Sequence, residues 1–420
     1  MIRPDALKLY RAATGLLEPI APALLADRAR KGKEDPARLS ERLARADTAR
    51  PGGPLVWLHG ASVGESLSIL PLVERLRAER PKVTVLVTSG TITSAALLAK
   101  RLPPGAIHQY IPVDAPGAAR RFIDRWKPSL AVFVESELWP NLLLEAKAAG
   151  TRLALVSAKL SDRSFRSWSK RPNAARQLLA GFDLILAQDA RAHERIEALG
   201  GKVAGEADLK FGAAPLPADA PALAMERERF SRPPLLIAST HPGEDEIALD
   251  AIVALAAKGG GSPPVILAPR HVERGPAIVE LAKARGLTAV LRSQEPGEIA
   301  DVVVADTLGE MGLWFRLAGT SLIAGSLVPG IGGHNPLEAA RLDCPAISGP
   351  FVENWTSAFA GLEGAGGVVM TTPEGLRAAL AADLADPAAA RDRAARARAY
   401  VDARDHEARA GLSRILELVP

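Results

Sequence analysis

Short apolar runs separated by segments of helix length dominate this sequence and restrict its fold. In the first half, the runs expected to be strands are Leu55–Leu58, Val83–Thr88, Ile107–Ile111, Leu130–Val134, Arg152–Val156, Leu184–Ala187 and Lys202–Ala204. In the second half they are Leu235–Ala238, Val265–Leu267, Thr288–Leu291, Val302–Ala305, Ser321–Ala324 and Ala346–Ile347. Parallel strands need crossover connections, so this alternation predicts parallel sheets covered by helices on both faces.

A stretch rich in proline and alanine, Ala213–Pro221, interrupts the alternation. Residues 213–234 are therefore predicted to be a linker. A chain of 420 residues is long enough for two domains. We expect an α/β protein with two Rossmann-like domains facing across a cleft, namely residues 1–212 and residues 235–420. The second domain should end in closing helices.

Charge and cysteine content narrow the classes of function. The net charge of +4 suits anionic ligands or an anionic membrane surface, but it is too small to indicate a nucleic-acid-binding protein. The single cysteine, Cys344, excludes an internal disulfide framework and a cysteine-based zinc site.

The first 33 residues are a candidate membrane-contact segment. Apolar positions with helical spacing precede the basic run Arg28–Lys33, and such a segment can lie on an anionic bilayer. No stretch of about 20 apolar residues is present to span one. The alternative, a surface helix of the first domain followed by a solvated charged run, stays open.

The stretch Leu55–Glu65 predicts a strand, a turn containing glycine and a helix start. Such a turn at the carboxyl end of a strand often binds phosphate. The glycines, Gly60 and Gly64, match neither a dinucleotide fingerprint nor a P-loop. Glu65 would also repel a phosphate, so this turn is expected to serve another purpose.

Three stretches of the second half are candidates for binding a nucleotide. In Ile331–Glu338, Asn335 and Glu338 are placed to start a helix, and free amides with a carboxylate can also receive a phosphate and a ribose. Arg270, next to Pro269 just past a strand, could bind phosphate or pair with Glu273. Gly309, Glu310 and Met311 follow another strand, where an ordinary helix turn is the simpler reading.

Charged residues elsewhere admit a catalytic or a structural role. Glu135 and Glu137 stand on one short loop, and Lys159 and Lys210 are candidate partners for them. His241, with Glu244 and Glu246 nearby, has no recognised metal-ligand spacing, and no metal is expected.

Together these motifs resemble the 3-deoxy-D-manno-octulosonic acid (Kdo) transferases of lipopolysaccharide synthesis, glycosyltransferases of the GT-B type. The collinear matches are Lys31–Glu34, Trp57–Glu65, Glu135–Asn141, Ser157–Ser164, Leu209–Phe211, His241–Glu244, Ala268–His271, Asp306–Met311 and Gly332–Glu338. The resemblance implies inverting transfer of Kdo from CMP-Kdo to a lipid A precursor at the cytoplasmic face of the bacterial inner membrane, without a cofactor.

The resemblance also implies roles for individual residues. Glu65 would be the general base, with Lys210 and Glu135, rather than Glu137, acting at the sugar. The CMP part of the donor would be bound by residues of the second half: Pro269, Arg270, Gly309, Glu310, Met311, Asn335 and Glu338.

Two stretches depart from the family pattern, and two rival functions remain. Ser157–Lys159 stands where the family usually has Asn-Ala-Arg, and Ala207–Gly212 where it has Gly-Asn-Leu-Lys-Phe-Asp. These changes put substrate details on that side in doubt. One rival is a GT-B enzyme acting on a different nucleotide sugar. The other is a non-catalytic, membrane-associated binding protein of the same fold.

Overall fold

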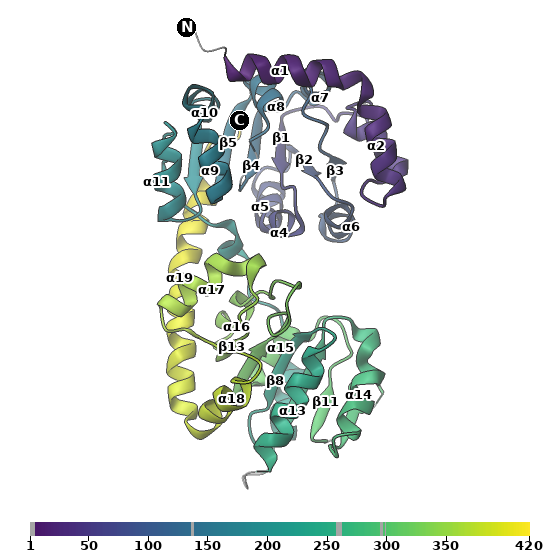
Figure 1. Ribbon diagram of the computed structural model, residues 1–420, viewed down its shortest axis with the longest axis vertical. Coiled ribbons are helices and arrows are strands. Elements are labelled where there is room, and N and C mark those ends of the chain that lie inside the picture. The colour runs from purple at the N-terminus through teal and green to yellow at the C-terminus, as the bar shows by residue number, and fades with distance from the viewer. Residues whose placement is uncertain (1–4, 136–137, 258–262, 295–296, 299) are drawn as a thin grey trace. The chain divides into compact units, whose positions relative to one another are not determined.

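The computed structural model describes residues 5–135, 138–257, 263–294, 297–298 and 300–420. The chain forms two compact units (Figure 1). The first comprises Met1–Ala213 and Arg404–Pro420, and the second comprises Ala214–Ala403.

The first unit is built on a seven-stranded parallel sheet in the order β3-β2-β1-β4-β5-β6-β7. Its strands are β1 Leu55–His59, β2 Thr84–Ser89, β3 Ala106–Tyr110, β4 Leu130–Val134, β5 Arg152–Ala158, β6 Leu184–Ala187 and β7 Gly205–Glu206. Its helices are α1 Ala6–Leu17, α2 Ala21–Arg30, α3 Leu39–Arg42, α4 Val63–Ser68, α5 Leu70–Glu79, α6 Ile92–Arg101, α7 Pro116–Trp126, α8 Pro140–Ala148, α9 Asp162–Ser169, α10 Pro172–Leu179 and α11 Ala190–Ala198. Short 3₁₀ turns are η1 Glu18–Ile20, η2 Pro36–Arg38 and η3 Leu209–Gly212.

The second unit repeats this plan in the order β10-β11-β9-β8-β12-β13-β14. Its strands are β8 Leu235–Thr240, β9 Val265–Pro269, β10 Ala289–Leu291, β11 Val302–Val304, β12 Thr320–Ile323, β13 Ala346–Ser348 and β14 Val368–Met370. Its helices are α12 Ala220–Arg229, α13 Glu244–Ala256, α14 Gly275–Lys283, α15 Met311–Leu317, α16 Leu337–Ala340, α17 Thr356–Gly364 and α18 Leu376–Ala385, together with most of α19 Pro387–Glu417. Its 3₁₀ turns are η4 Val272–Arg274 and η5 Glu353–Trp355.

Strand β1 shows why the first sheet is covered on both faces. Leu55 and Trp57 belong to one apolar cluster, whereas Val56 and Leu58 belong to another. Successive side chains of a strand point to opposite faces, so each face carries its own core. In Figure 1, α1 lies across α7 and α8 at one of these faces. The predicted α/β class with two Rossmann-like units is thus confirmed, while the cleft between them stays a prediction.

Several elements differ from those expected. The segment after Glu65 forms two helices, because Pro71 stands where the second one begins. The seventh strand is Gly205–Glu206 instead of Lys202–Ala204, and edge strand β14 was not expected. The predicted linker, residues 213–234, contains α12, whose Glu226 is buried and ion-paired with Arg292.

The C-terminal tail is divided between the two units, although the sequence placed all of residues 235–420 in the second domain. Leu412, Ile415, Leu416 and Val419 are buried in the same apolar cluster as β1 and β4 of the first unit. Arg414 donates a hydrogen bond to the carbonyl oxygen of Ala204, at 2.7 Å. The last turns of α19 therefore complete the first unit's core, a pairing that local sequence does not reveal.

The N-terminal helices are short and amphipathic. Across the residues that the structure describes, no helix has the length and apolar character needed to cross a bilayer.

Candidate functional site

In each unit, the strand order reverses direction at one point of the sheet. This point lies between β1 and β4 in the first unit and between β8 and β12 in the second. Open α/β sheets bind ligands outside the carboxyl ends of strands at such a switch point. Glu65 follows β1 and Glu135 follows β4, whereas His241 follows β8 and His334 follows β12.

Glu65 is held in a fixed position by the turn that precedes it. Its Oε2 accepts a hydrogen bond from the Ala61 amide at 2.7 Å, and its Oε1 accepts one from the Ser62 hydroxyl at 2.9 Å. Ser62 also caps α4 by accepting from the Glu65 amide at 3.3 Å. This is a capping arrangement of the Ser-x-x-Glu kind, which the sequence analysis did not consider.

Gly60 is required for this turn. A Cβ atom at Gly60 would lie 2.9 Å from the carbonyl carbon of Glu65 and 3.1 Å from its Cβ. A larger residue would push the start of α4 away from the sheet and would move Glu65 with it.

Glu135 forms an ion-paired triad with two lysines. Its Oε1 lies 2.8 Å from Lys210 Nζ, and its Oε2 lies 2.6 Å from Lys159 Nζ. The backbone of Glu135 has a φ of +62°, an unusual conformation for a residue other than glycine. The sequence analysis named both lysines as candidate partners, and the structure confirms them.

Ion pairing within the triad shifts the pKa values of Glu135 and Lys210. Burial alone would raise the pKa of the Glu135 carboxyl, but the Lys210 and Lys159 ammoniums together hold it below its ordinary value. Burial alone would lower the pKa of Lys210, but Glu135, with smaller contributions from Asp208 and Glu65, holds it above its ordinary value. Glu65 therefore lies close enough to Lys210 to interact with its charge.

The residues that depart from the family pattern converge on this triad. Ser157 Oγ accepts a hydrogen bond from the Leu209 amide at 2.9 Å, and Asp208 Oδ1 accepts one from the Lys210 amide at 3.0 Å. Both bonds fix the short turn η3 that carries Lys210. Lys159 itself replaces an arginine of the family pattern and pairs with Glu135. The departing residues Ser157, Lys159 and Asp208 thus take part in the contacts around Lys210 and Glu135.

In the second unit, the charge of Arg270 acts on Glu338, another of the residues proposed to bind the nucleotide. Arg270 is exposed directly after the buried Pro269 that ends β9. Burial raises the pKa of the Glu338 carboxyl, opposed by a hydrogen bond from Asn335 and by the charge of Arg270. Asn335 Nδ2 donates to Glu338 Oε1 at 3.2 Å, and Asn335 Oδ1 accepts from the Leu337 amide at 3.0 Å. Asn335 thus starts α16 and also orients Glu338.

Gly309, Glu310 and Met311 lie at the start of α15. Gly309 has a φ of +90° and no neighbour near its Cβ position, so ligand atoms could approach its backbone. The Glu310 carboxylate accepts from Thr307 and lies 3.2 Å from Arg292. Because its side chain is already engaged, any ligand contact by Glu310 is expected through its backbone.

A histidine pair beside Arg270 was not expected as a unit. His241 Nε2 and His334 Nε2 lie 2.9 Å apart, and the rings stack with their planes inclined by 12°. Burial lowers the pKa of His334 to about 4, with His241 and Arg270 acting in the same direction. Burial also lowers the pKa of His241. Both pKa shifts favour the neutral form of the pair, and Arg270 adds a positive charge at this edge.

Glu244 holds together two loops at the same edge of the sheet. This fully buried carboxylate accepts four backbone hydrogen bonds, from His241, Gly325, Ser326 and Leu327, at 2.7 to 3.0 Å. It joins the loop after β8 to the loop after β12. This role was not predicted from the sequence, because three of the four donors lie some 80 residues away from Glu244.

The structure brings the predicted residues together in two groups. Glu65, Glu135 and Lys210 form one group in the first unit, while Arg270, Asn335 and Glu338 form another in the second. Glu137, the alternative to Glu135, lies outside the described residues. No group of three or more metal-binding side chains suited to an ion is present among the residues that the structure describes.

Comparisons with known proteins agree on one family. Residues 37–213 match the family model described as 3-deoxy-D-manno-octulosonic-acid transferase (kdotransferase). A 3-deoxy-D-manno-octulosonic acid transferase of Rickettsia bellii is 38% identical over 348 residues, which cover 82% of each chain. One of Bordetella pertussis is 37% identical over 336 residues, which cover 77% of each chain.

Solved structures agree on the fold. MurG of Acinetobacter baumannii superposes with a TM-score of 0.56 at 11% identity, covering 87% of this chain and all of MurG. The UDP-GlcNAc 2-epimerase of Neisseria meningitidis gives 0.56 at 14% identity, covering 87% of this chain and 99% of the epimerase. These likenesses show a GT-B fold and, at such identities, nothing of the substrate.

Proposed function

Because the chain belongs to the 3-deoxy-D-manno-octulosonic acid transferase family of glycosyltransferases, we propose that it transfers Kdo from CMP-Kdo to a lipid A precursor with inversion. The observation that carries the mechanism is the Glu65 carboxylate, fixed by Ala61 and Ser62 beside the Lys210–Glu135 pair. Each of these groups belongs to the first unit.

Glu65 acts as the general base of the transfer. An acceptor hydroxyl oxygen attacks the anomeric carbon of Kdo, and its proton passes to the Glu65 carboxylate. At the same time the bond from that carbon to the phosphate oxygen of CMP breaks, and its electron pair leaves with CMP. Hydrogen bonds to both oxygens of Glu65 aim the carboxylate.

Lys210 and Glu135 act on charge that develops at the sugar. Lys210 keeps its proton because Glu135 raises its pKa, so it presents a fixed cation to the carboxylate of Kdo or to the attacked centre. The second pairing of Glu135, with Lys159, keeps Glu135 ionised and in place.

The second unit binds the CMP part of the donor. Arg270 is placed to pair with the phosphate, and Glu338 to accept hydrogen bonds from a ribose diol. Pro269, Asn335 and the backbone of Gly309–Met311 complete this set. The neutral histidine pair leaves Arg270 as the cation that stabilises the departing phosphate.

A direct assay tests the reaction. The purified protein is incubated with CMP-Kdo and lipid IVA, and the product is identified by mass spectrometry. We expect the acceptor mass to rise by one or more Kdo residues with release of CMP. Calorimetric measurement of nucleotide binding distinguishes the two alternative functions. A preference for UDP over CMP would indicate an enzyme acting on a different nucleotide sugar. CMP binding without turnover would indicate a non-catalytic binding protein.

We further propose that α1, η1 and α2 place the protein on the cytoplasmic face of the bacterial inner membrane. Six large apolar side chains of this segment are exposed: Leu9, Tyr10, Leu16, Leu17, Ile20 and Leu24. Leu7 and Leu25 are buried on the opposite side. The exposed side chains recur at helical spacing beside the basic end Arg28–Lys33, as in helices that lie in a bilayer interface.

Vesicle flotation tests this placement. Replacing Leu16, Leu17 and Leu24 by Gln should abolish binding to vesicles containing anionic lipid, since each exposed leucine contributes apolar area to the interface. The control replaces two exposed apolar residues elsewhere, Met225 and Leu384, by Gln and should still float. Equal flotation of both variants would show that this segment does not contact the membrane.

A further inference from the structure

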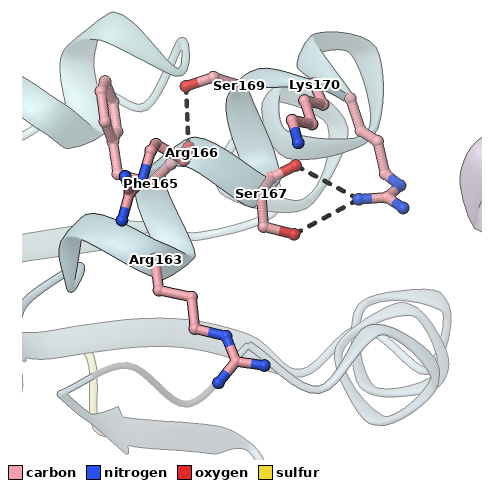
Figure 2. Close-up of a pocket in the computed structure, with 7 residues that line it drawn as sticks. Arg163, Phe165, Arg166, Ser167, Ser169 and Lys170 are labelled. Atoms are coloured by element: carbon pink, nitrogen blue, oxygen red, sulfur yellow. Dashed lines mark hydrogen bonds between the residues drawn. The ribbon is translucent and has the colours of Figure 1, made fainter.

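An open, cationic hollow lies on the first unit at helix α9, outside the residues assigned above. Its volume is about 790 Å³ (Figure 2). The side chains that line it are Arg163, Phe165, Arg166, Ser167, Ser169, Lys170 and Arg171. Four of these seven residues are basic, two carry hydroxyl groups and none is acidic.

Helical spacing explains why the basic residues share one surface. Arg163, Arg166 and Lys170 stand three and four positions apart, so they follow one side of α9 and its continuation. Phe165 and Trp168 pack against the apolar core of the unit, and Phe165 also borders the hollow. In Figure 2, the Arg163 side chain extends away from the helix.

The start of α9 is firmly attached to the rest of the unit. Ser161 caps the helix by accepting a hydrogen bond from the Ser164 amide at 3.1 Å. Asp162 pairs with Arg191 at 2.9 Å and also with Arg195. Asp162 is thus shared by two arginines of α11, and its charge also acts on Arg166.

The cations of the hollow are poorly compensated. Within the described part of the chain, Arg163 and Lys170 have no ion pair, and Arg166 and Arg171 donate only to oxygens of neighbouring residues in the same segment. Four exposed positive charges in one hollow repel each other, and a multiply charged anion relieves that repulsion. The site offers donors and almost no acceptors, which suits phosphate oxygens better than a base or a sugar diol.

The hollow belongs to the same sheet edge as the proposed catalytic group. Strand β5 ends at Ala158, Lys159 pairs with Glu135, and α9 begins three residues later. Strand β5 neighbours β4, which neighbours β1. Adjacent strands lie about 4.8 Å apart, so the end of β5 is on the order of 10 Å from the end of β1, where Glu65 begins its turn.

We propose that the hollow lined by Arg163, Arg166, Lys170 and Arg171 binds a phosphomonoester group of the sugar acceptor. This inference rests on the proposed function, in which the acceptor is a phosphorylated glucosamine disaccharide. Guanidinium groups can bind the phosphate through paired hydrogen bonds, and Lys170 adds a mobile cation. The phosphate would anchor the acceptor while its hydroxyl is presented to Glu65.

The test compares two acceptors and two variants. In the first variant, Arg163, Arg166 and Lys170 are replaced by Gln. The control replaces Lys100, Arg101 and Lys127 by Gln, which are exposed cations at the ends of α6 and α7 that point away from the catalytic edge. Transfer is measured in neutral detergent micelles with the phosphorylated acceptor and with the same acceptor after phosphatase treatment.

For the phosphorylated acceptor, the first variant should raise KM roughly tenfold or more with a much smaller change in kcat, because two or three charge-assisted contacts are lost. For the dephosphorylated acceptor, it should match the wild type. The KM for CMP-Kdo should be unchanged in both variants, and the control should match the wild type throughout. The single variant Lys170→Gln should show a smaller effect of the same kind.

Other outcomes overturn the inference in distinguishable ways. An equal rise in KM for both acceptors would show that the hollow does not bind the acceptor's phosphate. A defect that appears only with anionic vesicles, and not in neutral micelles, would assign the hollow to membrane lipid headgroups. If the wild type transfers no Kdo, the proposed function fails; if it transfers Kdo and the first variant equals it, only this inference fails.

Discussion

Glu65 owes its position to residues that are close in sequence. Gly60, Ala61 and Ser62 build its turn, and Ser62 accepts from its amide while donating to its carboxylate. Glu135 and Lys210, by contrast, are separated by 75 residues (210 minus 135) and meet only through the sheet. Sequence reasoning could therefore describe the first arrangement, but it could only nominate partners for the second.

Replacing Glu65 by Gln should reduce kcat by about 10²- to 10⁴-fold, the usual contribution of a general base. The amide keeps the size of the side chain but cannot take the acceptor's proton. CMP affinity, measured by calorimetry, should be unchanged, because the proposed nucleotide residues belong to the second unit. The matched control is Glu74→Gln, an exposed glutamate of α5, which should retain full activity. Loss of CMP binding in Glu65→Gln would contradict the assignment of the two substrates to different units.

Replacing Lys210 by Met should destabilise the protein by about 3 kcal/mol at pH 7, because it leaves a buried carboxylate with one cation fewer. Glu135 has a folded-state pKa below its ordinary value of 4.5. The stability from its ion pairs is therefore fully present above pH 4.5 and is lost as the pH falls through the folded pKa. The difference between wild type and variant should be largest near neutrality and should shrink below pH 4.5.

Urea unfolding at a series of pH values measures this difference. The control Lys147→Met breaks the exposed pair with Asp183, whose atoms lie 3.0 Å apart, and should cost about 1 kcal/mol or less. In the double variant Glu135→Gln with Lys210→Met, the stability change should depend little on pH in this range. A loss in Lys210→Met that stays constant from pH 7 to pH 3.5 would mean that Glu135 is not the group involved.

At the scale of elements, loops at the sheet edges are held by single side chains. Glu244 begins α13, yet three of its four amide donors come from the loop after β12. The strands themselves could be predicted, because buried parallel strands are continuous apolar runs. The short strand β7 and edge strand β14 could not, because packing and neighbouring strands decide them more than local composition does.

Replacing Glu244 by Gln should destabilise the second unit by about 3 kcal/mol or more. Four buried amides point at this side chain, and the glutamine NH₂ group cannot accept from any of them. Differential scanning calorimetry should show a lower midpoint, and CMP affinity should fall because the loop carrying His334 and Asn335 loosens. The control Glu246→Gln retains an oxygen for its one amide donor, Gly243, at 3.1 Å, and should cost much less. Similar midpoints for the two variants would argue against Glu244 as the link between the loops.

At the scale of the whole molecule, the two units are not two consecutive segments of the chain. Helix α19 starts in the second unit, and its residues from Arg404 onward belong to the first. Ile415 is fully buried in the cluster that contains Val56 and Val132. The first unit therefore cannot complete its core until the last residues of the chain have been made.

Replacing Ile415 by Ala should cost about 2 to 5 kcal/mol, as for other large-to-small changes in a core. Amide hydrogen exchange should show reduced protection in β1 and β4 of the first unit, while the strands of the second unit keep their protection. The control Glu417→Ala changes an exposed residue two positions further on and should have little effect. Reduced protection confined to the second unit would contradict the assignment of the tail.

The sequence by itself determined the α/β class, most of the strands and the family, and it nominated the residues proposed to carry the chemistry. It could do so because burial, turns and helix caps are encoded within a few neighbouring positions. Only the tertiary structure decided which charges meet. It joined Glu135 to Lys159 and Lys210, brought three distant amides to Glu244, stacked His241 on His334 and returned the tail to the first unit. Such pairings depend on strand order, and strand order is set by the packing of the whole sheet, so no local pattern records it.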